Sequence, residues 1–350
     1  QAHKLPHLST VIRMGEGQTA GMYNFAPVCD MGTEEHYARL AELKTELRPD
    51  DAINIQFTSG TTGSPKGATL SHCNILNNGY LAGEGMGFSD QDRLCIPVPL
   101  YHCFGMVLGN LACMAHGATA VYPSDAFDPV TTLQAVQEER CTALHGVPTM
   151  FINELDHPDF ADYDLSTLRT GIMAGSPCPV EVMKRVIGEM HMEDILIGYG
   201  QTECGSVVAV NAVGNRRAAT VGCPLPGYDV ALAEDGEIIV DSPSVTEGYL
   251  NCPATVGRRW HTGDLGEFDG DGEVDGEFSF SMKAKGKGRG KGRGNSNYDG
   301  YYNGYNNWDN RNGYYNGYYN APYGYAPAPY GYAPQAAPAA AQATEAPVAK

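Results

Sequence analysis

Short apolar runs separated by helix signals are the feature that most constrains the fold of this chain. Runs without polar alternation occur at residues 119–122, 143–147, 171–174 and 195–198. Between them, Asp128 followed by Pro129 predicts a helix ending near Arg140, and Pro179 predicts one through Ile187. A strand that is apolar on both faces is buried on both, so this alternation predicts parallel strands covered by helices. We therefore expect an α/β fold with parallel-sheet layers flanked by helices.

Near Val221 the sequence pattern changes to short segments in which apolar and polar residues alternate, separated by glycine turns. Residues 229–233 and 237–240 flank the turn Glu234–Asp235–Gly236, which predicts an antiparallel hairpin. We expect an incomplete α/β region over residues 1–220, followed by a small antiparallel β subdomain over residues 221–281. Upstream, the leucines within residues 33–47 predict an amphipathic helix.

Residues 282–350 have the composition of a different kind of polymer. They are rich in Gly, Tyr, Asn, Pro and Ala, with no Val, Leu or Ile between Met282 and Val348. Such a segment cannot enclose a core, so we expect it to be disordered. Its regularly spaced tyrosines favour self-association, or RNA contacts together with the basic start of the segment. In composition it resembles the Tyr/Gly-rich coat proteins of bacterial sulfur globules.

Charge and cysteine content exclude several classes of function. Residues 1–281 carry 15 Lys and Arg against 38 Asp and Glu, a net charge of −23, whereas residues 282–350 carry 8 against 3, a net charge of +5. So acidic a body repels nucleic acid and anionic lipid, and we expect no specific nucleic-acid partner. All ten cysteines lie before residue 282 without a Cys-x-x-Cys pair, which favours free thiols in a reducing cytoplasm over a disulfide framework or zinc site. No signal peptide or transmembrane segment is visible.

A ten-residue stretch from Thr58 to Gly67, Thr-Ser-Gly-Thr-Thr-Gly-Ser-Pro-Lys-Gly, follows the apolar run 53–57. Hydroxyls, unhindered glycine amides and one lysine suit a polyphosphate such as that of ATP. A Walker-type loop is excluded, because Pro65 precedes Lys66 and Gly67 follows it, so no helix can begin at the lysine in the usual way. A surface turn of the same composition is the plainer alternative.

The decapeptide resembles the signature of the adenylate-forming (AMP-binding) superfamily. Three further blocks resemble those of the superfamily and occur in its order: Pro-Leu-Tyr-His-Cys-Phe-Gly at 99–105, Gly-Tyr-Gly-Gln-Thr-Glu at 198–203 and His-Thr-Gly-Asp at 261–264. Shorter phrases resemble medium-chain fatty acyl-CoA synthetases in particular, at residues 69–72, 148–151 and 174–177. The resemblance covers roughly residues 1–272.

This resemblance implies an ATP-dependent acyl-CoA ligase. Such an enzyme joins a fatty acid to coenzyme A through an acyl-adenylate and releases AMP and pyrophosphate. The implied cofactors are ATP, Mg²⁺ and coenzyme A, and the implied substrate is a medium-chain fatty acid or related carboxylate. An aryl or amino acid substrate is the alternative within this class.

The resemblance also implies the site residues. Those expected to bind the nucleotide are Thr58, Ser59, Gly60, Thr61, Thr62, Gly63, Lys66, Gly175, Ser176, Tyr199, Gly200, Thr202 and Asp264. The loop would hold the β- and γ-phosphates, and Tyr199 would lie against adenine with Gly175 and Ser176 on its other side. Asp264 would accept the ribose hydroxyls.

The residues expected to act in catalysis are Lys66, His102, Thr202 and Glu203. Thr202 would hold the α-phosphate, and Glu203 would ligate Mg²⁺. His102 would border the acyl carboxylate, although a core histidine is the other interpretation. We expect His72 and His145 to be structural.

The chain departs from the family pattern at its two ends. Members carry a further part before the region that matches Gln1, and a mobile domain, with a lysine that contacts the reacting carboxylate, after the Thr-Gly-Asp block. After Gly272, Phe278 and Ser279 stand where a Gly-Arg pair is expected. Losing one such charged contact typically costs about 10²–10³ in rate, so we expect weak or no adenylation. The alternatives are a non-catalytic nucleotide-binding body with a self-associating tail, and a chimeric or frameshifted gene product that begins again at Met282.

Overall fold

The structure is a computed structural model that describes residues 7–58, 65–211, 220–253, 258–269 and 277–280. Residues 1–288 form one compact unit and residues 289–350 a second. The predicted disorder of residues 282–350 lies outside the described residues.

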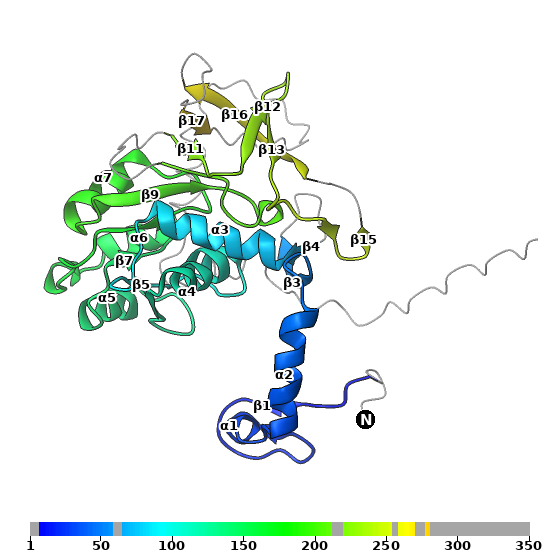
Figure 1. The fold of residues 1–350 in the computed structure, drawn as a ribbon. Helices are drawn as coiled ribbons and strands as arrows, with labels where there is room; N and C mark the ends of the chain where they lie inside the picture. Colours follow the sequence, from blue (N-terminus) through cyan, green and yellow to red (C-terminus); the bar gives the residue numbers. More distant parts are fainter. Residues whose placement is uncertain (1–6, 59–64, 212–219, 254–257, 270–276, 281–350) are drawn as a thin grey trace, which may run out of the picture. The chain divides into compact units, whose positions relative to one another are not determined.

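A seven-stranded sheet forms the centre of the first unit, in the order β11-β10-β9-β8-β7-β5-β6 (Figure 1). Five of its strands are parallel: β5 (Arg93–Cys95), β6 (Thr119–Val121), β7 (Ala143–Leu144), β8 (Thr170–Met173) and β9 (Asp194–Tyr199). Antiparallel strands β10 (Ala209–Val210) and β11 (Cys223–Pro224) extend one edge. All four residues of β8 are buried, which explains why its sequence does not alternate. The predicted parallel α/β sheet is confirmed.

The helices of this region are α3 (His72–Gly85), α4 (Ala112–His116), α5 (Pro129–Glu138), α6 (Pro148–Leu155) and α7 (Val180–Glu189), with the π-helix η1 (Phe104–Leu111) and the 3₁₀ turns η2 (Phe160–Asp162) and η3 (Thr202–Cys204). The helices predicted from Pro129 and from Pro179 are confirmed as α5 and α7. At the start of α5, the backbone N–H of Thr131 donates to Asp128 Oδ1 over 2.9 Å, so the predicted cap is present. No described helix is long and apolar enough to cross a membrane.

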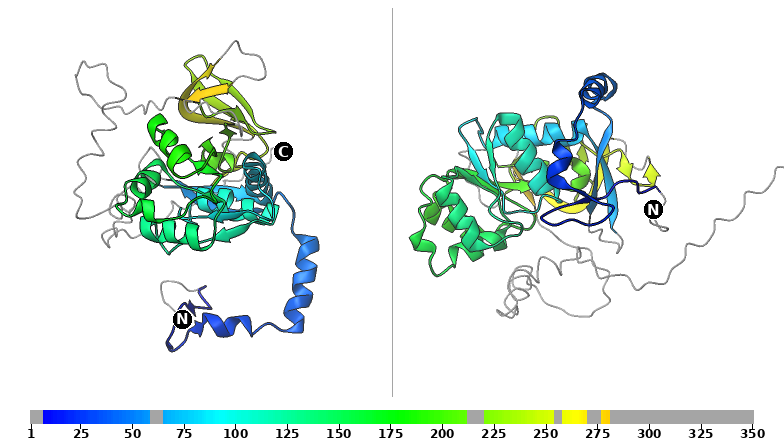
Figure 2. Two further views of the ribbon diagram at one scale, coloured as in Figure 1. Left: turned by 90° about the vertical axis from the view of Figure 1, so that its left-hand side faces the viewer. Right: turned by 90° about the horizontal axis from the view of Figure 1, so that it is seen from below.

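Two four-stranded antiparallel sheets also belong to this unit. One has the order β15-β14-β4-β3 and contains β3 (Ala52–Thr58), β4 (Lys66–Ser71), β14 (Gly248–Tyr249) and β15 (Cys252–Pro253). The other has the order β12-β13-β16-β17 and contains β12 (Asp229–Leu232), β13 (Glu237–Asp241), β16 (Arg259–Asp269) and β17 (Glu277–Phe280). This second sheet lies on the side of the large sheet that carries β9 and β11 (Figures 1 and 2). The hairpin predicted around residues 234–236 is confirmed by the pairing of β12 with β13.

The predicted division at residues 220/221 does not follow the sheets. Strand β11 comes after this point yet belongs to the large sheet, and β14 pairs with β4, so that Gly248 lies opposite Thr69. The sequence does not predict strand β4 either, because the residues of this strand do not form an apolar run or a clear alternation. Local patterns show which residues favour a strand, but not which distant segment will pair with it.

The N-terminal part contains β1 (Ile12–Arg13), β2 (Tyr23–Asn24), α1 (Phe25–Cys29) and α2 (Glu34–Glu46). Helix α2 confirms the helix predicted over residues 33–47, but it buries none of its residues. Leu40 is 55 % exposed, so the apolar stripe of α2 is not covered by any described residue.

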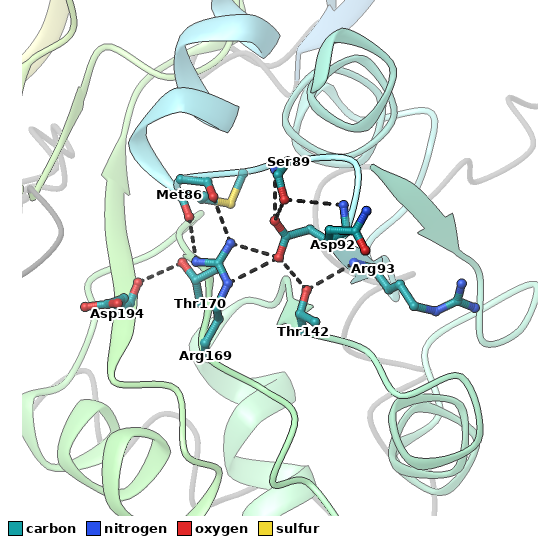
Figure 3. A network of polar contacts seen from close by, with 10 residues as sticks. Met86, Ser89, Asp92, Arg93, Thr142, Arg169, Thr170 and Asp194 are labelled. Carbon is teal, nitrogen blue, oxygen red and sulfur yellow. Dashed lines mark hydrogen bonds and ion pairs between the residues drawn. The ribbon is translucent and has the colours of Figure 1, made fainter. Parts of the chain in front are cut away.

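A polar clasp, formed by Ser89, Asp92, Thr142 and Arg169, joins the amino ends of the parallel strands (Figure 3). The Asp92 carboxylate accepts hydrogen bonds from Ser89 N at 2.8 Å, Thr142 Oγ1 at 2.7 Å and Arg169 Nη2 at 2.8 Å. Arg169 also donates to the carbonyl oxygens of Met86 and Gly87, at 3.1 and 2.9 Å. The clasp fixes the loop after α3 to the amino ends of β5, β7 and β8, which are opposite to the carboxyl ends of the same strands.

Candidate functional site

The predicted site residues follow the carboxyl ends of the parallel strands. His102 lies beyond β5, Gly175 and Ser176 beyond β8, and Gly200 and Thr202 beyond β9. Strand order reverses at β5, because β6 lies on one side of it and β7 on the other. In open α/β sheets, ligands bind outside the carboxyl ends at such a reversal. The fold therefore places these loops at the carboxyl ends of the parallel strands, where a ligand is expected.

The phosphate loop is the connection of a β-hairpin. Its first residue, Thr58, ends β3, and Lys66 begins β4 directly opposite it. Lys66 starts a strand and not a helix, as Pro65 and Gly67 predict. Ser59, Gly60, Thr61, Thr62 and Gly63 lie outside the described residues.

Tyr249 connects the end of this loop to Glu203. Its hydroxyl donates to Glu203 Oε1 over 2.8 Å, and the Lys66 ammonium lies 5.2 Å from the centre of its ring. Glu203 is only 8 % exposed. Burial and the neighbouring carboxylate both raise the pKa of Tyr249, so the phenol remains a hydrogen-bond donor at neutral pH.

Asp264, on β16, receives two donors from the loop after β9. Tyr199 Oη donates to Asp264 Oδ2 over 3.0 Å, and Gln201 Nε2 donates to the same oxygen over 2.7 Å. Trp260 Nε1 donates to Gln201 Oε1 over 2.8 Å. Burial raises the pKa of Asp264, and the hydrogen bonds from Tyr199 and Gln201 only partly offset this effect.

The residues around Glu203 contact those around Asp264. The rings of Tyr249 and Trp260 meet edge to face, with centroids 6.1 Å apart and an interplanar angle of 74°. Lys66, Glu203 and Asp264 come from three separate segments, and the structure brings them together through intervening side chains. No described cluster contains three or more His, Cys, Asp or Glu side chains arranged to hold a metal. A cation at Glu203 would therefore depend on oxygens of the ligand itself.

The aromatic-histidine block approaches Thr202. Cys103 Sγ lies 3.6 Å from Thr202 Oγ1 and 3.7 Å from His102 Nδ1, and the backbone N–H of Phe104 donates to that nitrogen over 3.0 Å. Burial lowers the pKa of His102, but the Cys103 thiol outweighs burial and the net shift is upward. Cys103 thus connects His102 to the Thr202 turn.

The other two histidines have different surroundings. His145 is fully buried, donates to Leu108 O over 3.0 Å and accepts from Ile172 N over 3.1 Å. Burial lowers the pKa of His145 to about 4, so this side chain is a neutral core residue. His72 is the first residue of α3.

Sequence reasoning missed Gln201, Tyr249 and Trp260. Gln201 lies inside a recognised block, and Trp260 directly precedes another, so their positions carried some signal. Tyr249 carried none, because only the pairing of β14 with β4 brings it to the site. Gly200 has a structural reason to be glycine, since a Cβ there would overlap the carbonyl oxygen of Ser206.

Comparison with known proteins agrees with this geometry. Residues 2–250 match the family described as AMP-binding enzyme, and residues 249–350 match that described as sulphur globule protein. A putative acyl-CoA synthetase, YngI of Bacillus subtilis (strain 168), is 46 % identical over 292 residues, covering 78 % of this chain and 53 % of the relative. The mitochondrial medium-chain acyl-CoA ligase ACSF2 of Danio rerio is 40 % identical over 291 residues, covering 77 % and 48 %. The chain thus spans about half the length of the curated relatives it matches.

Solved structures show the same fold. The anthranilate CoA ligase AuaEII in complex with anthranoyl-AMP aligns with a TM-score of 0.70 at 24 % identity, over 80 % of this chain and 55 % of that one. A benzoate CoA ligase from Burkholderia xenovorans LB400 aligns with a TM-score of 0.65 at 22 % identity, over 80 % and 61 %. The matched residues 2–250 include the α/β sheet, and the motif loops lie at the carboxyl ends of its strands. This match shows that the chain belongs to the AMP-binding enzyme family.

Proposed function

We propose that this chain carries the nucleotide-binding part of an ATP-dependent acyl-CoA ligase. Such an enzyme joins a fatty acid to coenzyme A through an acyl-adenylate, with release of AMP and pyrophosphate. The contact series from Lys66 through Tyr249 to Glu203, and from Trp260 through Gln201 to Asp264, is the observation that carries the proposal. It joins the ends of three motif blocks that are far apart in the sequence.

The proposed roles follow from where each group lies. Residues 58–63 and the Lys66 ammonium would neutralise the β- and γ-phosphates. Tyr199 would lie against adenine while its hydroxyl remains on Asp264, and Gly175 and Ser176, with Gly175 at a φ of +86°, would pass along the other side of the base. Thr202 would hold the α-phosphate, and His102, connected to it through Cys103, would face the reacting carboxylate. Catalysis would consist mainly of positioning and charge neutralisation.

Glu203 fits a role in holding Mg²⁺. Its side chain is buried, one of its oxygens accepts from Tyr249, and the other accepts no hydrogen bond from any described residue. A hard cation prefers such a carboxylate oxygen together with phosphate oxygens, and when bound it would offset the charge of the triphosphate.

We propose a medium-chain fatty acid as the carboxylate substrate, supported by the relatives named medium-chain acyl-CoA ligase. An aryl carboxylate is the alternative, supported by the solved ligases for anthranilate and benzoate. We also propose that the chain works in a reducing compartment such as the cytoplasm. Eight cysteines in the described part of the chain are free thiols, which is typical of such a compartment.

A second function is favoured by one specific observation. The match of residues 249–350 to sulphur globule protein, together with the Tyr/Gly repeats, favours a nucleotide-binding body that displays a self-associating tail. In this alternative the nucleotide site binds its ligand without turnover. Phe278 and Ser279, at the positions where the family pattern has Gly-Arg, are compatible with either function, because we expect slow adenylation from such a site.

Calorimetry on the full chain separates these possibilities. We expect a non-hydrolysable medium-chain acyl-adenylate analogue to bind at least about 10²-fold more tightly than ATP with Mg²⁺. Asp264→Ala should weaken both ligands by about tenfold or more, whereas Asp125→Ala, which alters an exposed aspartate, should change neither. Binding of ATP without preference for the analogue, and without pyrophosphate exchange, would favour the second function. Absence of any nucleotide binding would refute both.

A further inference from the structure

The Asp264 carboxylate is held by one of its two oxygens. Oδ2 accepts from Tyr199 Oη at 3.0 Å and from Gln201 Nε2 at 2.7 Å, whereas no described residue donates to Oδ1. A carboxylate oxygen has two lone-pair directions, so two donors saturate Oδ2. The acceptor capacity of Asp264 that is left for a ligand is therefore on Oδ1.

Gln201 is itself locked in orientation. Its carbonyl oxygen accepts from Trp260 Nε1 at 2.8 Å, and its amide nitrogen donates to Thr262 O at 3.0 Å as well as to Asp264. All its amide donors and one of its acceptor directions are therefore occupied. Reversing the amide would place its NH₂ group against the indole N–H and its oxygen against the carboxylate, which loses every one of these bonds.

We propose that Gln201 is a positioning residue that sets ribose specificity, by fixing Asp264 so that Oδ1 alone receives the 2′- and 3′-hydroxyls of the nucleotide. This inference rests on the proposed function and adds to it the residue and the atom that recognise the sugar. It also narrows the expectation from the sequence, which assigns the ribose hydroxyls to Asp264 without choosing between its two oxygens.

The arrangement makes the response to deoxynucleotides specific. With Asp264 preorganised, loss of either hydroxyl leaves a partly buried carboxylate with one fewer donor, and we expect about tenfold to 10²-fold weaker binding of 2′-deoxy-ATP or 3′-deoxy-ATP than of ATP. Without the Gln201 amide, only the hydrogen bond from Tyr199 holds Oδ2, so the carboxylate is free to rotate. Binding of ATP then weakens more than binding of the deoxynucleotides, so the ratio between them falls.

The test compares dissociation constants for ATP, 2′-deoxy-ATP and 3′-deoxy-ATP, each with Mg²⁺, measured by calorimetry on the full chain. Gln201→Met keeps the length of the side chain but cannot donate, and we expect its discrimination ratios to fall to less than about threefold. The matched control, Gln91→Met, makes the same change at an exposed glutamine whose side chain donates to Asp90 Oδ1, and it should keep the wild-type ratios. Trp260→Phe removes the N–H that orients Gln201 and should give intermediate ratios, which keeps the test decisive if Gln201→Met does not fold.

Ratios in Gln201→Met and Trp260→Phe equal to those of the wild type would overturn the inference while leaving the proposed function intact. Wild-type protein that binds ATP and both deoxynucleotides equally would also overturn it. Wild-type protein that binds no nucleotide would instead refute the proposed function, and the inference with it.

Discussion

Glu154, in α6, is a buried carboxyl group whose side-chain oxygens lack hydrogen-bond partners among the described residues. It is 1 % exposed, and burial raises its pKa well above the ordinary value. Between the ordinary carboxyl pKa and this raised pKa, the group is protonated in the folded chain and ionised in the unfolded chain, so the fold loses stability as pH rises through that range.

Glu154→Gln should remove this pH dependence. Above the unfolded pKa of about 4.3, the stability of the wild type relative to the variant should fall by about 1.4 kcal/mol per pH unit until the folded pKa is reached. Urea unfolding followed between about pH 5 and about pH 8 measures the difference. Glu138→Gln, at an exposed position of α5, is the control and should show no such slope. A parallel dependence in wild type and Glu154→Gln would show that Glu154 is ionised in the fold.

Gly200 offers a second test at the scale of a residue. A Cβ there would overlap the carbonyl oxygen of Ser206, so Gly200→Ala must displace the turn that carries Thr202 and Glu203. We expect a loss of about 2–4 kcal/mol in stability and a loss of nucleotide binding, measured by unfolding and calorimetry. Gly188→Ala, in α7, meets no atom within 4 Å and should instead stabilise the chain by about 0.5–1 kcal/mol. Equal effects of the two substitutions would contradict the packing described for the turn.

Among the elements, the polar clasp is what ties the amino ends of β5, β7 and β8 together (Figure 3). Burial alone would raise the pKa of Asp92, but hydrogen bonds from Thr142, Arg169 and Ser89 outweigh it, so the net pKa lies below the ordinary value. The clasp therefore stabilises the fold at neutral pH, and this contribution is lost as pH falls through the lowered pKa.

Asp92→Asn should lower the free energy of unfolding by about 2–4 kcal/mol at neutral pH, because it leaves the partners of a buried carboxylate incompletely paired. The difference from wild type should shrink as pH falls below about 4, where Asp92 of the unfolded chain takes up a proton, and should be lost below the lowered pKa of the folded chain. Asp156→Asn breaks an exposed ion pair with Arg185 and should change stability by less than about 1 kcal/mol. Chemical unfolding at several pH values measures both variants, and a difference that persists unchanged in acid would argue against the clasp.

Elements with local signals could be predicted from the sequence, and those defined by distant pairing could not. Strands β6, β8 and β9 are apolar runs bounded by turns, and α5 carries its own cap, so each could be placed approximately. Strand β4 is short and mixed in polarity, and β14 has only two residues, so each depends on the partner it pairs with.

The same distinction applies to the site. Lys66, Glu203 and Asp264 lie within ordered blocks of residues that the sequence displays directly. Tyr249 and Trp260 contribute through a hydrogen bond or ring contact to segments about 50 residues away, so their role depends on the folded geometry.

At the scale of the whole molecule, the charge distribution shapes ligand binding. Residues 1–281 carry 15 basic against 38 acidic side chains, so the field of the body opposes a polyanion such as ATP. Attraction must come from local groups such as the Lys66 ammonium, which lies 5.2 Å from the centre of the Tyr249 ring. Phosphate binding is therefore tied to the convergence of three segments, and no general surface attraction replaces it.

Amide hydrogen exchange on the full chain, with and without ATP and Mg²⁺, tests this convergence most directly. We predict that ATP slows exchange together in residues 58–67, 198–204 and 259–265, while residues 86–93 at the polar clasp are unchanged. Slowing confined to one of these three segments, or absent from all of them at saturating ATP, would contradict a single nucleotide site built from Lys66, Glu203 and Asp264.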